Sequence, residues 1–176
     1  MPSRKGEKGH KIASLSLILI FLVIAIIVSF IITQGDKKVV IIKNQNTNKI
    51  YLKKTVLESD TLIFGWIHSY EHIPWNEYYQ IQGNNKLLLN KIEVAGFGAG
   101  IPNNKGIVSI DDSGMIIMNE INEIFDHISW IHSQSALDFI KINSEIIVRG
   151  PDFPHHENLI LYIKDRWWYG EGWNWY

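Results

Sequence analysis

One cluster of residues has the types and spacing that zinc chemistry requires. His68, Glu71 and His72 form an H-x-x-E-H pattern, the inverted zincin motif, in which two histidines on one helical face bind the metal and the glutamate activates a water molecule. Pro74 disfavours a helix at the residue before it, and the β-branched, aromatic run that ends at His68 favours a strand. On a strand the two histidines would lie about 13 Å apart and could not bind the same ion. We therefore expect a strand end followed by a polar turn, and keep a zinc-dependent hydrolase as an alternative function.

A glycine-rich loop follows farther along the chain. Gly96, Gly98 and Gly100 alternate with other residues directly after a predicted strand. The loop does not match the dinucleotide-binding fingerprint, which would need glycine in place of Ile101, and it lacks the Lys-Ser/Thr end of a P-loop. Alternating glycines permit positive φ angles or the close approach of another backbone. We expect internal packing at this loop, with a bound ligand as the alternative.

The rest of the chain offers no further catalytic pattern. The sequence has no G-x-S-x-G elbow, no EF-hand spacing and no cysteine, so disulfides and thiolate zinc sites are excluded. His155 and His156 are adjacent, and adjacent side chains on an extended chain point in opposite directions, so we expect a solvated loop there. The sequence thus predicts no catalytic residue, no metal site and no cofactor, in a protein that is not an enzyme.

Aromatic residues crowd the C-terminus, where six of the last ten residues are Trp or Tyr. We expect these rings to pack over an open end of the core. The alternatives are an aromatic belt at the lipid headgroups and a stacking platform for sugars or a partner protein, as in a cell-wall or carbohydrate-binding surface module. The candidate partner contacts in this segment are Trp168, Trp173 and Trp175.

The elements that position these residues are predicted to be mostly strands. Short β-branched runs with a period of two are separated by Asn, Gly and Asp, as is typical of antiparallel sheets. Only Ile121, Ile124, Phe125 and Ile128 have helical spacing, which predicts a short helix near residues 120–128. We expect a mainly β fold, an antiparallel β-sandwich or a partly open barrel. The predicted strands are Val39–Lys43, Ile50–Val56, Leu62–His68, Glu77–Gln82, Lys86–Val94, Gly106–Ile110, Met115–Met118, Phe139–Ile142, Glu145–Val148 and Leu159–Lys164.

One tetrapeptide occurs twice. Trp66–Ser69 recurs as Trp130–Ser133, but the flanking segments do not align. True repeats show sustained self-similarity, so we interpret the match as chance.

An apolar segment precedes the β region. Residues 12–32 are 21 residues without a charge, and a helix of that length matches a hydrocarbon core of roughly 30 Å. The segment is longer than the apolar region of a cleaved signal peptide and has no A-x-A site, so it predicts an uncleaved transmembrane signal anchor. Residues 1–11 carry a net charge of +3, which by the positive-inside rule keeps the N-terminus in the cytoplasm and sends the remainder outside.

These observations divide the chain into four parts. We expect a basic cytoplasmic tail over residues 1–11, the anchor over 12–32, a short linker over 33–38 and an extracytoplasmic β-rich domain over 39–176. The net charge of the whole chain is −1, so the residues after the basic tail carry −4. That charge argues against a general nucleic-acid surface.

Two stretches taken together resemble a known family. Residues 68–77 and 97–102 are similar to the bacterial domain-of-unknown-function family eighteen-fifty, whose pattern is H-S-x-x-x-x-P-x-x-E-x-[YF], then a strand, then F-G-A-G-x-P. The resemblance covers roughly residues 55–105, and its first stretch also contains Glu71 and Trp75. The positions that match the pattern are His68, Ser69, Pro74, Glu77, Tyr79, Phe97, Gly98, Gly100 and Pro102.

The resemblance implies a function that the residues alone do not. The family usually carries an N-terminal hydrophobic segment and is associated with TAXI-type TRAP transporters, which import organic acids or similar small solutes. We therefore expect a single-pass membrane protein whose extracytoplasmic β domain is a non-enzymatic accessory component of such an uptake system, in contact with the permease or its solute-binding protein. We hypothesise that His68 and Glu77 cap and pin the strand–turn–strand unit and face the glycine loop.

Overall fold

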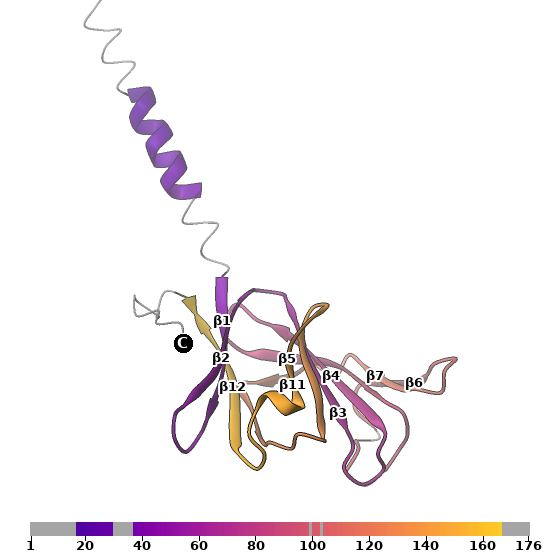
Figure 1. The fold of residues 1–176 in the computed structure, drawn as a ribbon. Coiled ribbons are helices and arrows are strands. Elements are labelled where there is room, and N and C mark those ends of the chain that lie inside the picture. The colour runs from indigo at the N-terminus through magenta and orange to yellow at the C-terminus, as the bar shows by residue number, and fades with distance from the viewer. Residues whose placement is uncertain (1–16, 30–36, 99, 103, 167–176) are drawn as a thin grey trace, which may run out of the picture. The chain divides into compact units, whose positions relative to one another are not determined.

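The computed structural model describes residues 17–29, 37–98, 100–102 and 104–166 of the 176-residue chain, which divides into one unit over residues 1–36 and a second over 37–176. In the first unit residues 17–29 form a helix (Figure 1). Its apolar side chains, such as Phe21 and Ile26, are exposed. Among the described residues no helix is both long and apolar enough to cross a membrane. Residues 12–16 and 30–32 of the predicted anchor lie outside the described residues, as do residues 1–11.

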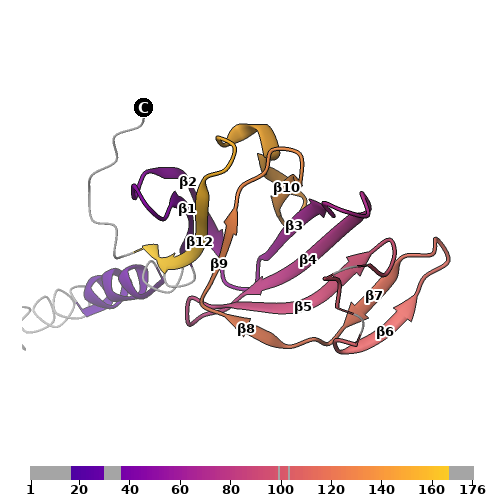
Figure 2. The same cartoon turned by 90° about the horizontal axis from the view of Figure 1, so that it is seen from below.

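The second unit is built from strands, as the sequence predicts. They form two antiparallel sheets, and within the described part of the chain neither sheet closes into a barrel (Figure 2). One sheet has the order β2-β1-β12-β9, and the other has the order β11-β10-β3-β4-β5-β7-β6, with β8 also paired to β5. The strands are β1 (Lys37–Asn44), β2 (Ile50–Leu57), β3 (Thr61–Ile67), β4 (Pro74–Ile81), β5 (Leu87–Val94), β6 (Ile107–Ile110), β7 (Ile116–Asn119), β8 (Glu123–Phe125), β9 (His127–Ile131), β10 (Leu137–Ile142), β11 (Glu145–Arg149) and β12 (Asn158–Asp165), with a 3₁₀ turn, η1, at Gly150–Asp152.

Turn residues fix the predicted hairpins. The Asn44 side-chain oxygen accepts hydrogen bonds from the backbone N–H groups of Asn46 and Thr47, which shapes the turn between β1 and β2. The Asp111 carboxylate does the same for Ser113 and Met115 between β6 and β7. Short polar side chains that bond to the backbone two to four residues ahead are the reason such sequences form turns.

The helix predicted near residues 120–128 is wrong. This segment forms β8, which pairs with β5, and β9, which pairs with β12. Glu120 and Asn122 have φ angles of 56° and 57°, which a right-handed helix does not allow. Ile124 is 63% exposed, whereas Phe125 and Ile128 pack against the core. The helical spacing was therefore produced by two short extended segments and not by one helical face.

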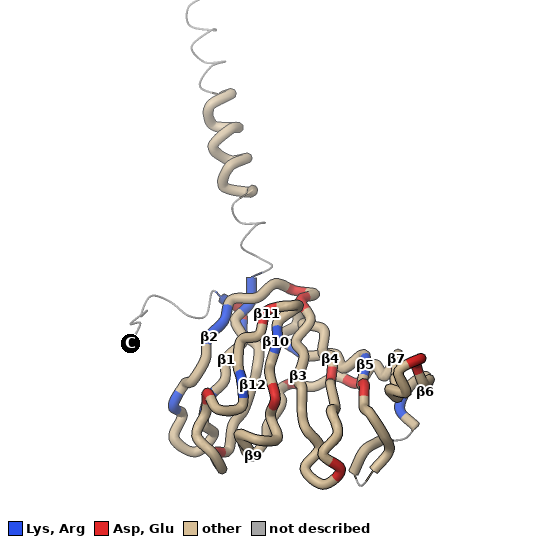
Figure 3. The backbone as a smooth tube through the Cα atoms, turned by 45° about the vertical axis from the view of Figure 1, so that its right-hand side comes forward, with Lys and Arg blue, Asp and Glu red and all other residues tan. Residues whose placement is uncertain are grey.

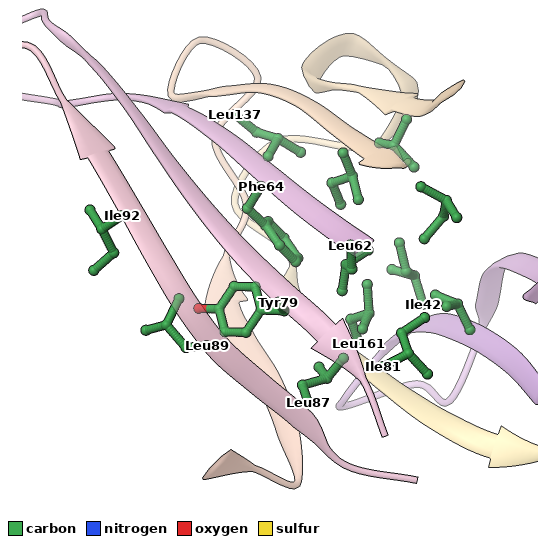
Figure 4. Packing of buried hydrophobic residues seen from close by; sticks show 14 of the residues in the cluster. Ile42, Leu62, Phe64, Tyr79, Ile81, Leu87, Leu89, Ile92, Leu137 and Leu161 are labelled. Atoms are coloured by element: carbon green, nitrogen blue, oxygen red, sulfur yellow. The ribbon is translucent and has the colours of Figure 1, made fainter. Parts of the chain in front are cut away.

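Both sheets contribute to one hydrophobic core. Ile42 of β1 and Leu161 of β12 belong to the same buried cluster as Leu62, Phe64 and Ile81 of the larger sheet (Figure 4). Burying a side chain of this size stabilises a fold by roughly 1.5–3 kcal/mol, so the shared core holds the two sheets together. Charged residues of both signs are interspersed over the strands around this core (Figure 3).

A buried lysine ties three elements at one end of the second unit. Lys38 of β1 is 3% exposed, and its Nζ donates to the Asp165 carboxylate of β12 at 2.8 Å. It also donates to the Gly83 carbonyl and the Asn85 side chain in the turn between β4 and β5, at 2.7 and 3.0 Å. These bonds satisfy a charge that would otherwise be costly to bury.

Candidate functional site

The H-x-x-E-H residues lie in a turn between β3 and β4. The backbone N–H of His72 donates to the His68 carbonyl at 2.9 Å, and the Glu71 N–H donates to Nδ1 of His68 at 3.1 Å. His72 has a φ of 54°, so the segment is not helical. The polar turn expected from Pro74 is confirmed, and the helical face that a zincin needs is not formed. Ser69 is exposed in this turn, and Pro74 begins β4 opposite Ile67.

No group of three His, Asp or Glu side chains within the described residues is arranged to hold a metal ion. His155 and His156 are exposed, with ring centroids 3.8 Å apart. They therefore lie on the surface, as the sequence predicts.

The glycine loop packs against that turn. A Cβ atom added at Gly98 would lie 2.6 Å from Cγ of Glu71, and one added at Gly96 would lie 3.4 Å from Ile73. Gly100 has a φ of +81°, which favours glycine. Close internal packing, the preferred interpretation of the alternating glycines, is what the structure shows. On either side of Gly98, Phe97 is 54% exposed and Ile101 is buried, while Pro102 is half-buried.

The described residues show how His68 and Glu77 are held at this strand–turn–strand unit. His68 holds the turn through Glu71, and its ring stacks on Trp75 with the centroids 6.1 Å apart. The Glu71 side chain packs beside Gly98 of the loop. Glu77 bonds instead to side chains of β3 and β4: Trp66 Nε1 donates to its Oε2 at 3.4 Å, and the Tyr79 hydroxyl donates to the same oxygen at 3.0 Å.

Aromatic rings from four strands gather next to Glu77. We call Phe64, Trp66, Tyr79, Phe125 and Trp130 the aromatic cluster. Phe64 and Trp66 stack at 5.4 Å, and Trp130 meets both edge-on at 5.5 and 6.3 Å. Tyr79 lies beside Phe64 (Figure 4), edge-on to it at 6.2 Å. It is also edge-on to Phe125, at 5.8 Å. Trp66, Phe125, Trp130 and Glu77 all keep some solvent-accessible surface, so the cluster is not sealed inside the core.

Hydrogen bonds orient Trp130, which comes from the smaller sheet. Its Nε1 donates to Nδ1 of His132 at 3.3 Å, and Nε2 of that fully buried histidine lies 2.8 Å from the Gly150 carbonyl. The two copies of the repeated tetrapeptide therefore supply Trp66 and Trp130, whose rings meet between the sheets. The two tryptophans thus lie in the same part of the fold, although each copy of the tetrapeptide makes different hydrogen bonds.

Charge near Glu77 is unevenly distributed. Burial raises the pKa of the Glu77 carboxyl, against the hydrogen bonds from Tyr79 and Trp66 and the positive charge of Lys105. Lys105 itself bonds to both carboxylate oxygens of Glu123, at 2.7 and 2.6 Å. Burial and the charges of Glu77 and Glu123 raise the pKa of the Tyr79 hydroxyl. Glu77 is therefore a largely buried carboxyl group close to the Lys105–Glu123 ion pair.

One indole N–H near Glu77 has no partner. Nε1 of Trp75 is the one buried side-chain nitrogen or oxygen atom within the described ranges that makes no hydrogen bond. Trp75 and Glu77 are two residues apart on β4, so their side chains are on the same face of the sheet. An unpaired buried donor costs stability, so in a native structure it calls for a specific explanation.

The structure gathers only part of the predicted set and adds residues that the sequence did not indicate. Trp75, Glu77 and Tyr79 lie together, whereas His68 and Glu71 belong to the neighbouring turn and glycine loop. Sequence reasoning missed Trp66, Lys105, Phe125 and Trp130 as site residues. The repeated tetrapeptide was the one signal that pointed to two of them. Trp168, Trp173 and Trp175 lie outside the described residues.

Comparison with known proteins identifies the region that builds this site. Residues 62–147 match the family model described as Domain of unknown function (DUF1850). The resemblance expected from the two sequence stretches is thus confirmed, and it extends well beyond them. The DUF1850 match runs from β3 into β11 and includes every residue of the aromatic cluster, while β1, β2 and β12 lie outside it. No curated protein and no solved structure matches the chain.

Proposed function

We propose that this protein is a membrane-anchored, non-enzymatic accessory component of a TAXI/TRAP-type solute uptake system, and that its β domain contacts the permease or its solute-binding protein. The DUF1850 match supports the resemblance from which the uptake system is inferred. The observation that supports a contact with a partner is the exposed edge of the last strand of the larger sheet.

β6 is an apolar edge strand that nothing in the described chain covers. It ends the order of its sheet and pairs on one side with β7, and the hairpin lies at the far end of that sheet from β3 (Figure 2). Ile107, Val108 and Ile110 are 59%, 40% and 67% exposed. Stand-alone proteins usually protect such an edge with charges, proline or a covering loop, because its free backbone groups pair with other chains. An extended segment of a partner can add to this edge and bury the three side chains.

The membrane anchor is proposed from the sequence. Residues 12–32 are uncharged and apolar, and the described part of that run, residues 17–29, is a helix with exposed apolar side chains. The basic tail supports a cytoplasmic N-terminus, with residues 39–176 on the outside of the cell membrane.

Mild-detergent purification of the tagged full-length protein from its native membrane tests the proposal. We expect mass spectrometry of the eluate to find a multi-span permease or an extracytoplasmic solute-binding protein. Ile110→Lys, which places a charge on the β6 edge, should remove that partner. Ile131→Lys is the matched control, because Ile131 is 71% exposed on β9 of the other sheet. Recovery of the bait alone, under conditions that retain a known permease complex, would contradict the proposal.

A further inference from the structure

We propose that the outer face of the smaller sheet binds the anionic lipid headgroups of the membrane. The outer face is the side of this sheet turned away from the shared core, and it carries the side chains of Lys37, Lys43, Lys53 and Lys164. The inference rests on the proposed membrane anchor, but it requires neither a permease nor a solute-binding protein.

Alternation along β1 puts two of these lysines on the outer face. Val40 and Ile42 belong to the buried cluster, so their side chains point toward the larger sheet. Side chains on a strand alternate between its two faces. The odd-numbered residues of β1, which include Lys37 and Lys43, are therefore on the outer face. Nζ of Lys43 donates to the Asn48 side-chain oxygen at 2.8 Å, a neutral partner that does not compensate its charge.

The neighbouring strands contribute the other two lysines. Lys53 of β2 lies opposite Ile41, and Lys164 of β12 lies opposite Val39. Residues directly opposite each other in an antiparallel pair have their side chains on the same face. Both Lys53 and Lys164 are exposed. The adjacent strands β2, β1 and β12 (Figure 1) thus present lysines on one surface of the sheet.

No acidic side chain lies among these lysines. The one carboxylate in the four strands of this sheet is that of Asp165, which bonds to the buried Lys38. Within the described residues, Lys37, Lys43 and Lys164 form no ion pair. Lysines away from the outer face do pair with carboxylates, namely Lys38, Lys54, Lys86, Lys91 and Lys105. The outer face therefore has a positive charge that the described residues leave uncompensated.

The sign of this charge is opposite to that of the domain as a whole. The residues after position 11 carry a net charge of −4, although they include the four lysines of the outer face. An anionic membrane would repel the rest of such a domain and attract this face. The distribution of charge thus favours one orientation of the domain on the lipid.

Two sequence features favour lipid as the partner. Only residues 33–36 separate the predicted anchor from Lys37, the first residue of β1, so an anchored chain holds this sheet close to the membrane. Six of the last ten residues, which follow β12 directly, are Trp or Tyr, and these types are enriched where membranes meet water. An acidic protein partner would not explain the short link to the anchor.

A fluorescent label on each of two faces tests the inference in the full-length chain, which has no native cysteine. Thr55→Cys places a bimane label on the outer face, since Thr55 is exposed and lies opposite Val39. Ser109→Cys is the control, an exposed position on β6 of the larger sheet. The chain is reconstituted into phosphatidylcholine vesicles with and without about 30% phosphatidylglycerol, and a nitroxide-labelled headgroup serves as the quencher.

We expect phosphatidylglycerol to increase quenching of the label at Thr55→Cys at least about twofold, and to leave the label at Ser109→Cys unchanged. Because the attraction is between exposed charges, about 0.5 M NaCl should remove the increase. An equal increase at both positions would overturn the proposal. No increase at either position would also overturn it, and would point to an acidic protein as the partner of the lysines.

Neutral variants locate the charges that are responsible. Lys37→Gln combined with Lys164→Gln removes two charges from the outer face and should abolish most of the increase at Thr55→Cys. Lys86→Gln combined with Lys141→Gln is the matched control, because it changes the net charge equally at the larger sheet. Circular dichroism checks that both double variants fold. If both keep the full increase, or both lose it equally, the outer face is not the lipid contact and the proposal fails.

The result is separable from the proposed function. Flotation of the chain with neutral phosphatidylcholine vesicles tests the anchor alone, and co-purification of a permease tests the uptake role. A phosphatidylglycerol effect at Thr55→Cys without a co-purified permease would support this inference while the uptake role fails. A recovered permease without that effect would leave the uptake role standing and overturn the lipid contact.

Discussion

Glu77 and Glu93 lie on neighbouring strands, and their surroundings shift the pKa of the two carboxyl groups in opposite directions. Burial raises the pKa of Glu77 above its ordinary value of 4.5. For Glu93, burial is outweighed by hydrogen bonds from Lys91 and Tyr78 and by the charge of Lys91, and the pKa falls below that value. A raised carboxyl pKa means that the folded state favours the protonated acid, so ionisation of Glu77 destabilises the fold.

Glutamine variants of Glu77 and Glu93 should therefore respond to pH with opposite signs. The stability that protonated Glu77 contributes is present below its unfolded pKa and is lost as the pH rises through its folded pKa, so Glu77→Gln should raise the Tm at pH 7 and lose that advantage near pH 4. Glu93 contributes stability above its unfolded pKa, so Glu93→Gln should lower the Tm at pH 7, with a smaller loss at low pH. Thermal unfolding from pH 4 to 8 measures both differences. A Glu77→Gln variant that is less stable than the natural chain at pH 7 would contradict the assignment.

Gly150 should be the glycine least tolerant of a side chain among those with negative φ. A Cβ atom there would lie 2.3 Å from the carbonyl oxygens of both Gln134 and Leu137, and backbone atoms cannot move aside easily. Gly150→Ala should therefore cost about 3 kcal/mol or more in the free energy of unfolding. The backbone movement that alanine requires would also disturb His132. Its Nε2 lies against the Gly150 carbonyl, and its Nδ1 orients Trp130.

Gly114→Ala provides the comparison for that variant. Gly114 has a φ of +87° with no heavy atom within 4 Å of a Cβ, so alanine meets only the backbone preference, about 1–2 kcal/mol. Chemical denaturation of both variants would give the two costs. Equal costs would show that the close contacts at Gly150 relax.

At the scale of elements, Lys38 joins β1, β12 and the turn between β4 and β5. Lys38→Met should cost about 3 kcal/mol of unfolding free energy, since it removes a buried partner and leaves three acceptors without their donor. Lys54→Met is the matched control, because the Lys54–Glu145 pair is exposed and exposed pairs contribute about 0–1 kcal/mol. Urea denaturation of the two variants distinguishes them, and similar losses would show that the buried position of Lys38 adds nothing.

The strands were predictable and the site only partly so, for a physical reason. Period-two runs and Asn, Gly or Asp turns are local signals, and all ten predicted strands occur close to their expected positions. Ile121, Ile124 and Phe125 misled the prediction because spacing alone does not reveal the positive φ angles at Glu120 and Asn122. The aromatic cluster depends on how two sheets face each other, and no short segment encodes that pairing.

The glycine loop illustrates the same limit at closer range. Its sequence indicated close approach of another segment but could not say which carboxylate would arrive there. Glu71 and Glu77 both precede the loop in the sequence. Glu71 lies in the turn in which His72 has a φ of 54°, and its side chain packs against Gly98. Glu77 lies on β4 and accepts a hydrogen bond from Trp66.

At the scale of the molecule, the region that matches DUF1850 is smaller than the folding unit. Residues 62–147 supply the larger sheet and β9, but Ile42 and Leu161 of the shared core come from β1 and β12. A chain of residues 37–176 should fold alone with a Tm within a few degrees of the full-length protein, because it holds the complete second unit. A chain of residues 62–147 should not fold cooperatively. Circular dichroism during heating checks both, and a cooperative transition from the shorter chain would contradict the shared core.

The register of β1 has a mechanical consequence. Lys38 lies opposite Asp165, so the two described ends of the second unit leave the sheet side by side. Tension applied between those ends would separate the residue pairs of the β1–β12 ladder one after another. The Lys38–Asp165 pair would bear the force first. Tension between Lys37 and a partner held at β6 would instead run across the core and strain many contacts at once. A domain tethered at one end and held at its far edge would therefore resist pulling much better than the same domain pulled apart by its own termini.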